Sequence, residues 1–204
     1  MTTSTLEDIY RNKYPYLQEL ALKIQTDLFN YLNGKVRIDR VSARAKSVPR
    51  FVEKANKKNK NGSIKYDNPL NQIQDQVGAR IITYYLADVD EIACIVKKYY
   101  SFIEELDKRP DSITEFGYFG KHFILLIPDE LKPKQEEVEI PTFFELQIKT
   151  LFQHAWGEAE HDLNYKTEEP LADDDKRMIA YSSAQAWGAD QIFNTLYKKY
   201  NSES

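Results

Sequence analysis

The sequence predicts an α+β fold in which helices pack against a mixed β-sheet. Segments with the strand pattern interleave with segments with the helix pattern, and no repeat or low-complexity linker interrupts them. The chain has 204 residues, of which 42% are hydrophobic and 29% are charged. That length and composition are typical of a soluble globular protein with one buried core, so we expect one domain with appendages.

The first half of the chain contains two predicted helices and two predicted strands. Ser4 and Glu7 form a capping-box pattern that opens the first helix, and Asn33-Gly34 is a stop signal. In order, we expect a helix to about Leu32, a strand over 36–43, a helix over about 47–58, an exposed loop over 57–71 and a strand over 77–85.

The second half repeats this interleaving. Asp88 is expected to cap a helix that runs to about residue 105, and Pro128 ends the next strand. In order, we expect that helix, a strand over 118–127, a charged loop over 129–139, a strand over 143–149, a helix to about residue 165 and a last helix over about 173–200.

Composition and charge exclude several classes of protein. The net charge is −4, so any anion site must be a local basic patch. Cys94 is the only cysteine, which excludes an intrachain disulfide and fits a reducing cytoplasm. No signal-peptide pattern opens the sequence and no run approaches the ~18 apolar residues of a membrane span, so we expect a cytoplasmic protein without a membrane partner.

A polar strand face is the most informative feature. Glu145, Gln147 and Lys149 alternate with apolar residues, so all three point to one side of the strand. Packing alone does not require an acid, an amide and a base there. The following helix places His154 on a polar face of its own, where it could contact a nucleotide or hold the neighbouring strand.

Cations recur before this strand. Lys46, Arg50 and Lys54 repeat every four residues and follow Arg44, so one helical face is a cationic stripe. Arg and Lys both match phosphate oxygens, and the stripe predicts a polyphosphate grip. Taken alone, the stripe is more often a solvated helix face.

Two further groups complete the candidate site. Asp75, with Gly78 and Arg80 just beyond it, opens a strand, and its carboxylate could hold Mg²⁺ together with Glu145. The alternative for Asp75 is a turn residue that starts the strand. Tyr118 could stack on a base, and Lys121 or His122 could touch a phosphate; the alternative is a core tyrosine and a structural histidine.

Taken together, the motifs resemble the synthetase domain of the RelA/SpoT family in its single-domain form, the small alarmone synthetases and their toxic relatives. The matching pieces are, in order, Arg44-x-Lys46 with Lys54, Asp75-x-x-Gly78-x-Arg80, Gly117-Tyr118-x-x-x-His122, Glu145-x-Gln147-Ile148-Lys149 and His154-Ala155-Trp156. The resemblance implies about five strands flanked by helices in a nucleotidyltransferase-like fold. It also divides the chain into an N-terminal helix (1–34), a synthetase core (35–166) and a C-terminal helical extension (167–204).

The resemblance implies a pyrophosphokinase that transfers pyrophosphate from ATP to the ribose 3′-hydroxyl of GDP or GTP and thereby makes (p)ppGpp. The residues and the resemblance together assign ATP binding to Arg44, Lys46, Arg50, Lys54 and Arg80, acceptor binding to Tyr118, Lys121, His122, Lys149 and His154, catalysis to Asp75, Glu145 and Gln147, and Mg²⁺ binding to Asp75 and Glu145. By the resemblance, Tyr118 would stack on the guanine.

The acceptor side departs from the family pattern. Phe119-Gly120 stands where the family often has Arg-Ser or Arg-Gly, and Lys149 replaces a common Arg. This leaves a second hypothesis open, a toxic relative that pyrophosphorylates the 3′ CCA end of tRNA and is restrained by an antitoxin protein. A third hypothesis is a non-enzymatic nucleotide sensor, which the carboxylates Asp75 and Glu145 disfavour. The sequence leaves open whether the protein forms a homo-oligomer.

Overall fold

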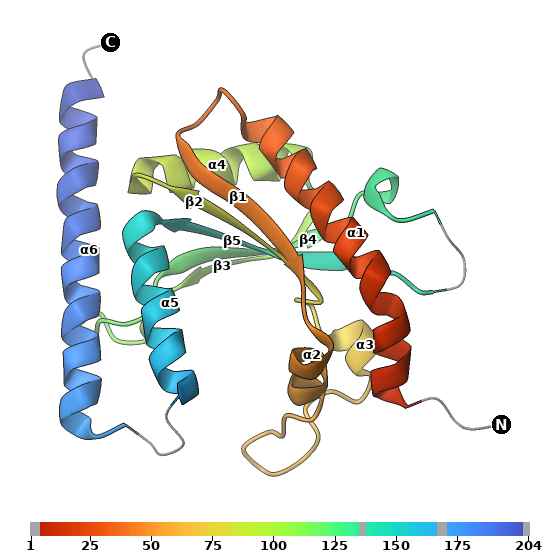
Figure 1. Ribbon diagram of the computed structural model, residues 1–204. Helices are drawn as coiled ribbons and strands as arrows, with labels where there is room; N and C mark the ends of the chain where they lie inside the picture. Colours follow the sequence, from red (N-terminus) through yellow and green to blue (C-terminus); the bar gives the residue numbers. More distant parts are fainter. Residues whose placement is uncertain (1–4, 135–137, 167–170, 202–204) are drawn as a thin grey trace.

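The computed structural model describes residues 5–134, 138–166 and 171–201 and contains one five-stranded mixed sheet with helices on both sides (Figure 1). The strands are β1 (Ile38–Ala45), β2 (Val77–Thr83), β3 (Phe102–Lys108), β4 (Gly120–Leu126) and β5 (Phe143–Thr150). The helices are α1 (Leu6–Leu32), α2 (Val48–Ala55), α3 (Pro69–Gln72), α4 (Leu86–Tyr99), the 3₁₀ turn η1 (Asp129–Leu131), α5 (Leu151–Lys166) and α6 (Asp173–Asn201). The predicted α+β fold is confirmed.

The strand order β1-β2-β5-β4-β3 puts β5 at the centre of the sheet. β5 runs parallel to β2 and antiparallel to β4, and its residues pair with both neighbours. Gln147 lies between Arg80 of β2 and His122 of β4 in this register. Because side chains of paired residues project to the same face, the sheet itself brings these three polar groups together.

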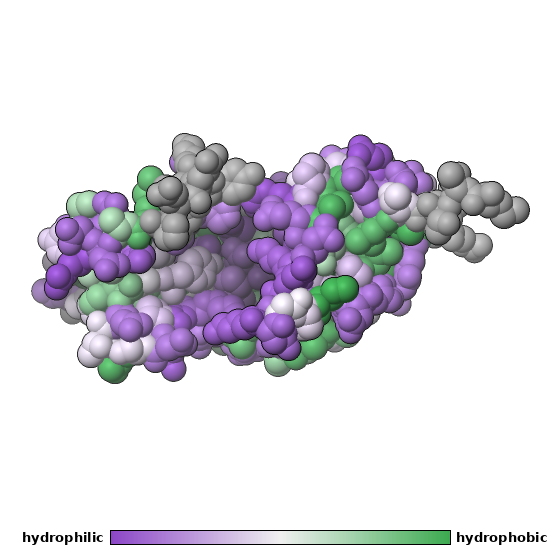
Figure 2. Space-filling model, turned by 90° about the horizontal axis from the view of Figure 1, so that it is seen from below, coloured by the Kyte–Doolittle hydropathy of each residue, from purple (hydrophilic) through white to green (hydrophobic). Residues whose placement is uncertain are grey.

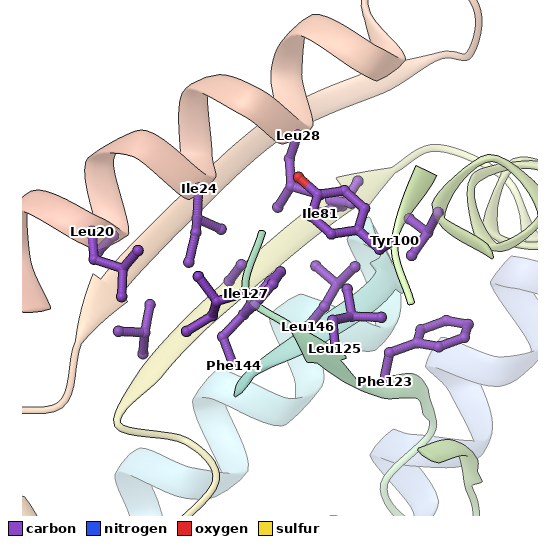
Figure 3. Packing of buried hydrophobic residues seen from close by; sticks show 14 of the residues in the cluster. Leu20, Ile24, Leu28, Ile81, Tyr100, Phe123, Leu125, Ile127, Phe144 and Leu146 are labelled. Atoms are coloured by element: carbon purple, nitrogen blue, oxygen red, sulfur yellow. The ribbon is translucent and has the colours of Figure 1, made fainter. Parts of the chain in front are cut away.

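The apolar face of the sheet forms the core under α1 and α4 (Figure 3). Leu20, Ile24 and Leu28 recur on one side of α1 and point onto the sheet, where Ile81 and Leu146 lie. All five are buried. This four-residue spacing is typical of a helix that buries one stripe. The opposite face of the sheet is left for the polar side chains.

The two C-terminal helices lie side by side near the polar face. α5 follows β5 directly, and α6 packs along α5 (Figure 1). The rings of Phe152 and Phe193 stack at a centroid distance of 5.7 Å in this contact. Among the described residues, no helix is both long enough and apolar enough to cross a lipid bilayer.

Several predicted boundaries were wrong. The first helix begins at Leu6 and is capped by Thr5, whose hydroxyl accepts from the Asp8 amide, while Asp8 accepts from the Thr5 amide. Ser4, the predicted cap, lies outside the described residues. Asp88 is the third residue of α4 and bonds back to the Tyr85 amide, so it caps from inside the helix.

The strand β3 was missed, because the predicted helix ran on to residue 105. α4 instead ends at Tyr99, and the chain turns at once into β3. β3 is an edge strand with most of its residues exposed, so its acidic side chains carry no alternating apolar signal. The strand predicted over 118–127 begins only at Gly120, so Tyr118 lies in the preceding segment.

Candidate active site

A cavity of about 370 Å³ opens on the polar face of the sheet. Its walls come from β1, β2, β5 and the start of α2: Ser42, Ala43, Arg44, Ala45, Lys46, Ser47, Arg50, Asp75, Gly78, Ala79, Arg80, Glu145 and Gln147. Figure 2 shows a hollow in the middle of the molecule surrounded by hydrophilic residues. The structure therefore gathers Lys46 and Arg50 of the cationic stripe and both predicted metal carboxylates around one space.

Asp75 lies in the turn before β2 and is held by two lysines. Lys46 Nζ lies 2.9 Å and Lys54 Nζ 3.0 Å from Asp75 Oδ2. The other oxygen, Oδ1, is buried and has no hydrogen-bond partner among the described residues. Burial alone would raise the pKa of Asp75, but the two lysines outweigh it and hold the pKa below its usual value. The carboxylate is therefore charged and keeps one oxygen available for a cation.

Glu145, on β5, is held by a histidine and an amide. His122 Nδ1 lies 3.0 Å from Glu145 Oε1, and Gln147 Nε2 donates to Oε2 over 3.3 Å. Burial pushes the pKa of Glu145 upward, yet the hydrogen bond from His122 outweighs it, so the pKa is lowered. Gln147 Oε1 is buried without a partner among the described residues, so it has acceptor capacity for a ligand hydroxyl.

Tyr118 joins this group from the segment before β4. Its hydroxyl lies 2.9 Å from His122 Nε2, while the other ring nitrogen of His122 faces Glu145. A hydroxyl donated to Nε2 would fix the tautomer in which Nδ1–H donates to the carboxylate. Lys149 Nζ sits 4.3 Å from the centroid of the Tyr118 ring, so a base could stack on that face only if Lys149 moved.

Two glycines make room for this ring. A Cβ at Gly120 would lie 3.1 Å from the Tyr118 hydroxyl oxygen, and a Cβ at Gly157 would lie 3.4 Å from Tyr118 Cε2. The protein's own Tyr118 therefore fills the space beside Gly120. Burial raises the pKa of Tyr118, and the nearby negative charge of Glu145 adds to this, so the hydroxyl stays protonated.

Arg80 links the cavity to α5. Its guanidinium lies 2.8 Å from Glu158 Oε1 and 3.3 Å from His154 Nδ1. His154, predicted to bind the acceptor, thus contacts a residue predicted to bind ATP. Burial and the positive charge of Arg80 lower the pKa of His154. The same two causes lower the pKa of the buried Lys149, to about 8.

Of the remaining predicted residues, two line the cavity and one does not reach it. Arg44 and Arg50 line the cavity with exposed side chains, as a phosphate grip requires. Lys121 does not reach the cavity. Its neighbour His122 points to the cavity side of β4, so Lys121 points to the opposite side. There Lys121 pairs with Asp107 at 2.9 Å and with Glu105 at 3.4 Å. The structure therefore does not bring Lys121 to the site.

The donor set suits Mg²⁺. Asp75 and Glu145 line the same cavity, and the described residues contain no group of three or more His, Cys, Asp or Glu side chains that would hold a metal by themselves. Mg²⁺ on nucleotides typically uses one or two carboxylates and completes its shell with phosphate oxygens and water. The unpartnered Asp75 Oδ1 fits such an ion.

Comparison with known proteins identifies the family. A family model described as "Region found in RelA / SpoT proteins" matches residues 43–170, more than half of the chain. The chain belongs to the RelA/SpoT family. The resemblance inferred from the motifs is therefore confirmed, and the matched region contains every predicted site residue.

RelA/SpoT relatives agree with this assignment. The chain is 28% identical to the GTP pyrophosphokinase YjbM of Bacillus subtilis over 192 residues, which cover 89% of this chain and 85% of YjbM. Small alarmone synthetase 1 of Bacillus subtilis, solved with its product pppGpp, aligns with a TM-score of 0.69 at 25% identity over 95% of each chain. Small alarmone synthetase 2 of Bacillus subtilis shares the fold, with a TM-score of 0.74 at 20% identity over 93% of this chain and 98% of its own.

Two site residues escaped the sequence reasoning. Ser42 lines the cavity two residues before Arg44, and the period-two alternation of β1 could have found it. Glu158 lies one turn after His154 on α5, and its ion pair with Arg80 depends on how α5 packs over β2. No local pattern in the sequence predicts that pair.

Proposed function

We propose that the chain is an ATP-dependent pyrophosphokinase that transfers the β,γ-pyrophosphate of ATP to the ribose 3′-hydroxyl of GDP or GTP and makes (p)ppGpp. The observation that carries the proposal is the meeting of Asp75, Glu145 and a set of Arg and Lys side chains around one cavity. Membership of the RelA/SpoT family and the name of the relative YjbM support the same reaction.

In this proposal the cationic wall of the cavity binds the donor. Arg44, Lys46 and Arg50 reach it from β1 and α2, with Lys54 bound to Asp75 and Arg80 on the neighbouring strand β2. Phosphoryl-type transfer depends mainly on positioning and on neutralising charge, which these side chains provide. Asp75 and Glu145 would hold Mg²⁺, which supplies further charge neutralisation on the phosphates when it is bound.

In this proposal Glu145 receives the proton. The acceptor 3′-oxygen forms a bond to the β-phosphorus of ATP, the bond from that phosphorus to the α–β bridging oxygen breaks, and AMP leaves. The 3′-hydroxyl proton passes to the Glu145 carboxylate, which His122 and Gln147 hold in place. The lowered pKa keeps the Glu145 carboxylate ionised before the transfer. Because the same shift weakens the carboxylate as a base, its proposed role rests on its position.

The acceptor decides between this function and a second candidate, pyrophosphate transfer to the 3′ CCA end of tRNA. A basic loop favours the second candidate: Lys57, Lys58, Lys60 and Lys65 are exposed on a loop next to the donor wall. The bridge between Lys58 and Ile64 and the turn at Gly62 give this loop a defined shape. An exposed cluster of lysines suits a nucleic-acid backbone, and an antitoxin partner belongs to this candidate.

Incubation with γ-labelled ATP and, separately, GDP, GTP or bulk tRNA tests both candidates. Label in the free guanosine nucleotide, absent with Asp75→Asn, supports the first. Label in tRNA, reduced by Lys57→Glu and Lys58→Glu in a salt-dependent way, supports the second. No label in any acceptor would contradict both.

A homo-oligomer remains part of the proposal. Ile192, Leu196 and Tyr200 recur every four residues on α6 and are exposed by 61%, 44% and 72%. Exposed apolar side chains in one row on a helix are typical of a surface that packs against another chain. Light scattering of the purified protein measures the oligomeric state directly.

A further inference from the structure

The segment that carries Tyr118 is held in place by α6. Residues 109–119 connect β3 to β4 without a helix or strand of their own, and most of their side chains are exposed. Within the described chain, one hydrogen bond ties the backbone of this segment to a helix: Ser183 Oγ donates to the Gly117 carbonyl over 2.6 Å. Ser183 is only 2% exposed, so water competes little for this bond.

A ring contact reinforces the bond one turn further along α6. The rings of Phe116 and Trp187 meet edge to face with centroids 5.7 Å apart. Ser183 and Trp187 are four residues apart and so share one face of α6. Together they hold the two residues that directly precede Tyr118.

α6 is itself fixed to the sheet and to α5. The Thr150 hydroxyl at the end of β5 donates to Asp190 over 2.8 Å, and both residues are buried. On α5, Trp156 Nε1 donates to Ser182 Oγ over 3.0 Å and to the Ile179 carbonyl over 3.3 Å. Ser183 lies between these anchors, so its position relative to β5 is set by rigid elements.

We propose that Ser183 is a positioning residue that places Gly117, and through it Tyr118, against His122 and Glu145. The inference rests on the proposed function and extends it to α6, which begins after the matched family region ends at residue 170. α6 is thereby part of the acceptor half of the site. Three hydrogen bonds make this connection. They join Ser183 to Gly117, the neighbouring Tyr118 to His122, and His122 to Glu145.

The substitution Ser183→Ala tests this, with Thr195→Ala as the matched control. Thr195 is exposed on the same helix, and its hydroxyl donates to the Gln191 carbonyl of α6 itself. Loss of one hydrogen bond is expected to raise the acceptor KM by about two- to tenfold. The KM for ATP should stay within about twofold, because the donor wall belongs to β1, β2 and α2. Thr195→Ala should change neither.

Hydrogen exchange followed by mass spectrometry provides a readout that needs no activity. Amides of residues 111–119 should exchange faster in Ser183→Ala, while amides of β2 keep their protection. If the wild type has no pyrophosphokinase activity, the proposed function fails and this measurement still tests the contact. Unchanged exchange in 111–119, or equal changes in the KM values for donor and acceptor, would overturn the positioning role.

Discussion

Lys46 Nζ lies 2.9 Å from Asp75 Oδ2, so a cation predicted to bind phosphate neutralises a carboxylate predicted to bind metal. Lys54 makes the same contact at 3.0 Å. A polyphosphate would attract these lysines away from Asp75. The carboxylate charge would then be free to bind the metal that enters with the nucleotide. The donor and the metal are therefore expected to bind together.

We predict that metal affinity depends on the donor. Titration of Mn²⁺, followed by electron paramagnetic resonance, should show weak binding to the protein alone and stronger binding when a non-hydrolysable ATP analogue is present, after correction for metal bound by the analogue itself. Lys46→Met should strengthen binding of the metal alone by roughly five- to tenfold, because removal of one neighbouring cation is worth about 1 kcal/mol in this setting. Identical metal affinities for the wild type and Lys46→Met would contradict the pairing.

Asp75→Asn should abolish transfer while the fold is retained. Removal of a metal carboxylate costs several kcal/mol of transition-state stabilisation, which corresponds to a rate loss on the order of a thousandfold or more. Asp67→Asn, at an exposed position in the nearby loop, is the control and should have wild-type activity. Thermal unfolding checks the fold, and an Asp75→Asn rate within about tenfold of wild type would exclude Asp75 as an essential ligand.

Tyr118 should contribute through its ring more than through its hydroxyl. Tyr118→Phe removes the contact with His122 Nε2, which is worth about 0.5–1.5 kcal/mol, so kcat should fall about two- to tenfold. Tyr118→Ala also removes the surface for a base, which is worth about 1–3 kcal/mol, and should raise the acceptor KM by a further ten- to hundredfold. Steady-state kinetics with the acceptor varied separates the two effects. Equal losses in both variants would mean that the ring does not bind the base.

Asp190→Asn should stabilise the protein at neutral pH. Burial raises the pKa of Asp190 to about 6, and within the described part of the chain only one of its oxygens has a partner, the Thr150 hydroxyl. An acid whose pKa is higher in the folded state binds protons more tightly there, so stability falls as the pH rises from about 4 to about 6. The cost at pH 7.5 is about 3 kcal/mol at most.

The asparagine variant avoids this cost and can still accept the Thr150 hydroxyl. Urea unfolding at pH 7.5 and pH 5 should therefore show a gain for Asp190→Asn that is larger at pH 7.5. Asp90→Asn, at an exposed position of α4, is the control and should show no such pH-dependent gain. A gain of the same size at both pH values would contradict the raised pKa.

Local patterns predicted which side chains share a face of the sheet or helix. The alternation of Glu145, Gln147 and Lys149 predicted that all three share the polar face of β5. The four-residue spacing of Lys46, Arg50 and Lys54 predicted that they share one side, and in the structure these side chains line the cavity or contact Asp75. These predictions succeeded because periodicity fixes which residues share a face. Periodicity does not give the partner across space, so the pairing of Lys46 and Lys54 with Asp75 was not foreseen.

The acceptor half was harder to predict. Tyr118 and Lys121 were assigned to a strand that begins only at Gly120, and within a strand Lys121 must face away from its neighbour His122. β3 was hidden because an exposed edge strand can be rich in charge. The bond from Ser183 to Gly117 joins residues far apart in sequence, and only the packing of α6 reveals it.

Because β5 lies at the centre of the sheet, the site is complete only after the last strand has joined it. β1 and β2 form one antiparallel pair, β3 and β4 form another, and β5 joins them although it is the last strand to be synthesised. Neither pair alone holds Glu145 or Gln147, so a nascent or partly unfolded chain without β5 in place has the cations but lacks the proposed base. Pairings between segments so distant in sequence form slowly. Activity therefore reports on complete folding, and a chain that has not closed its sheet cannot consume ATP by this reaction.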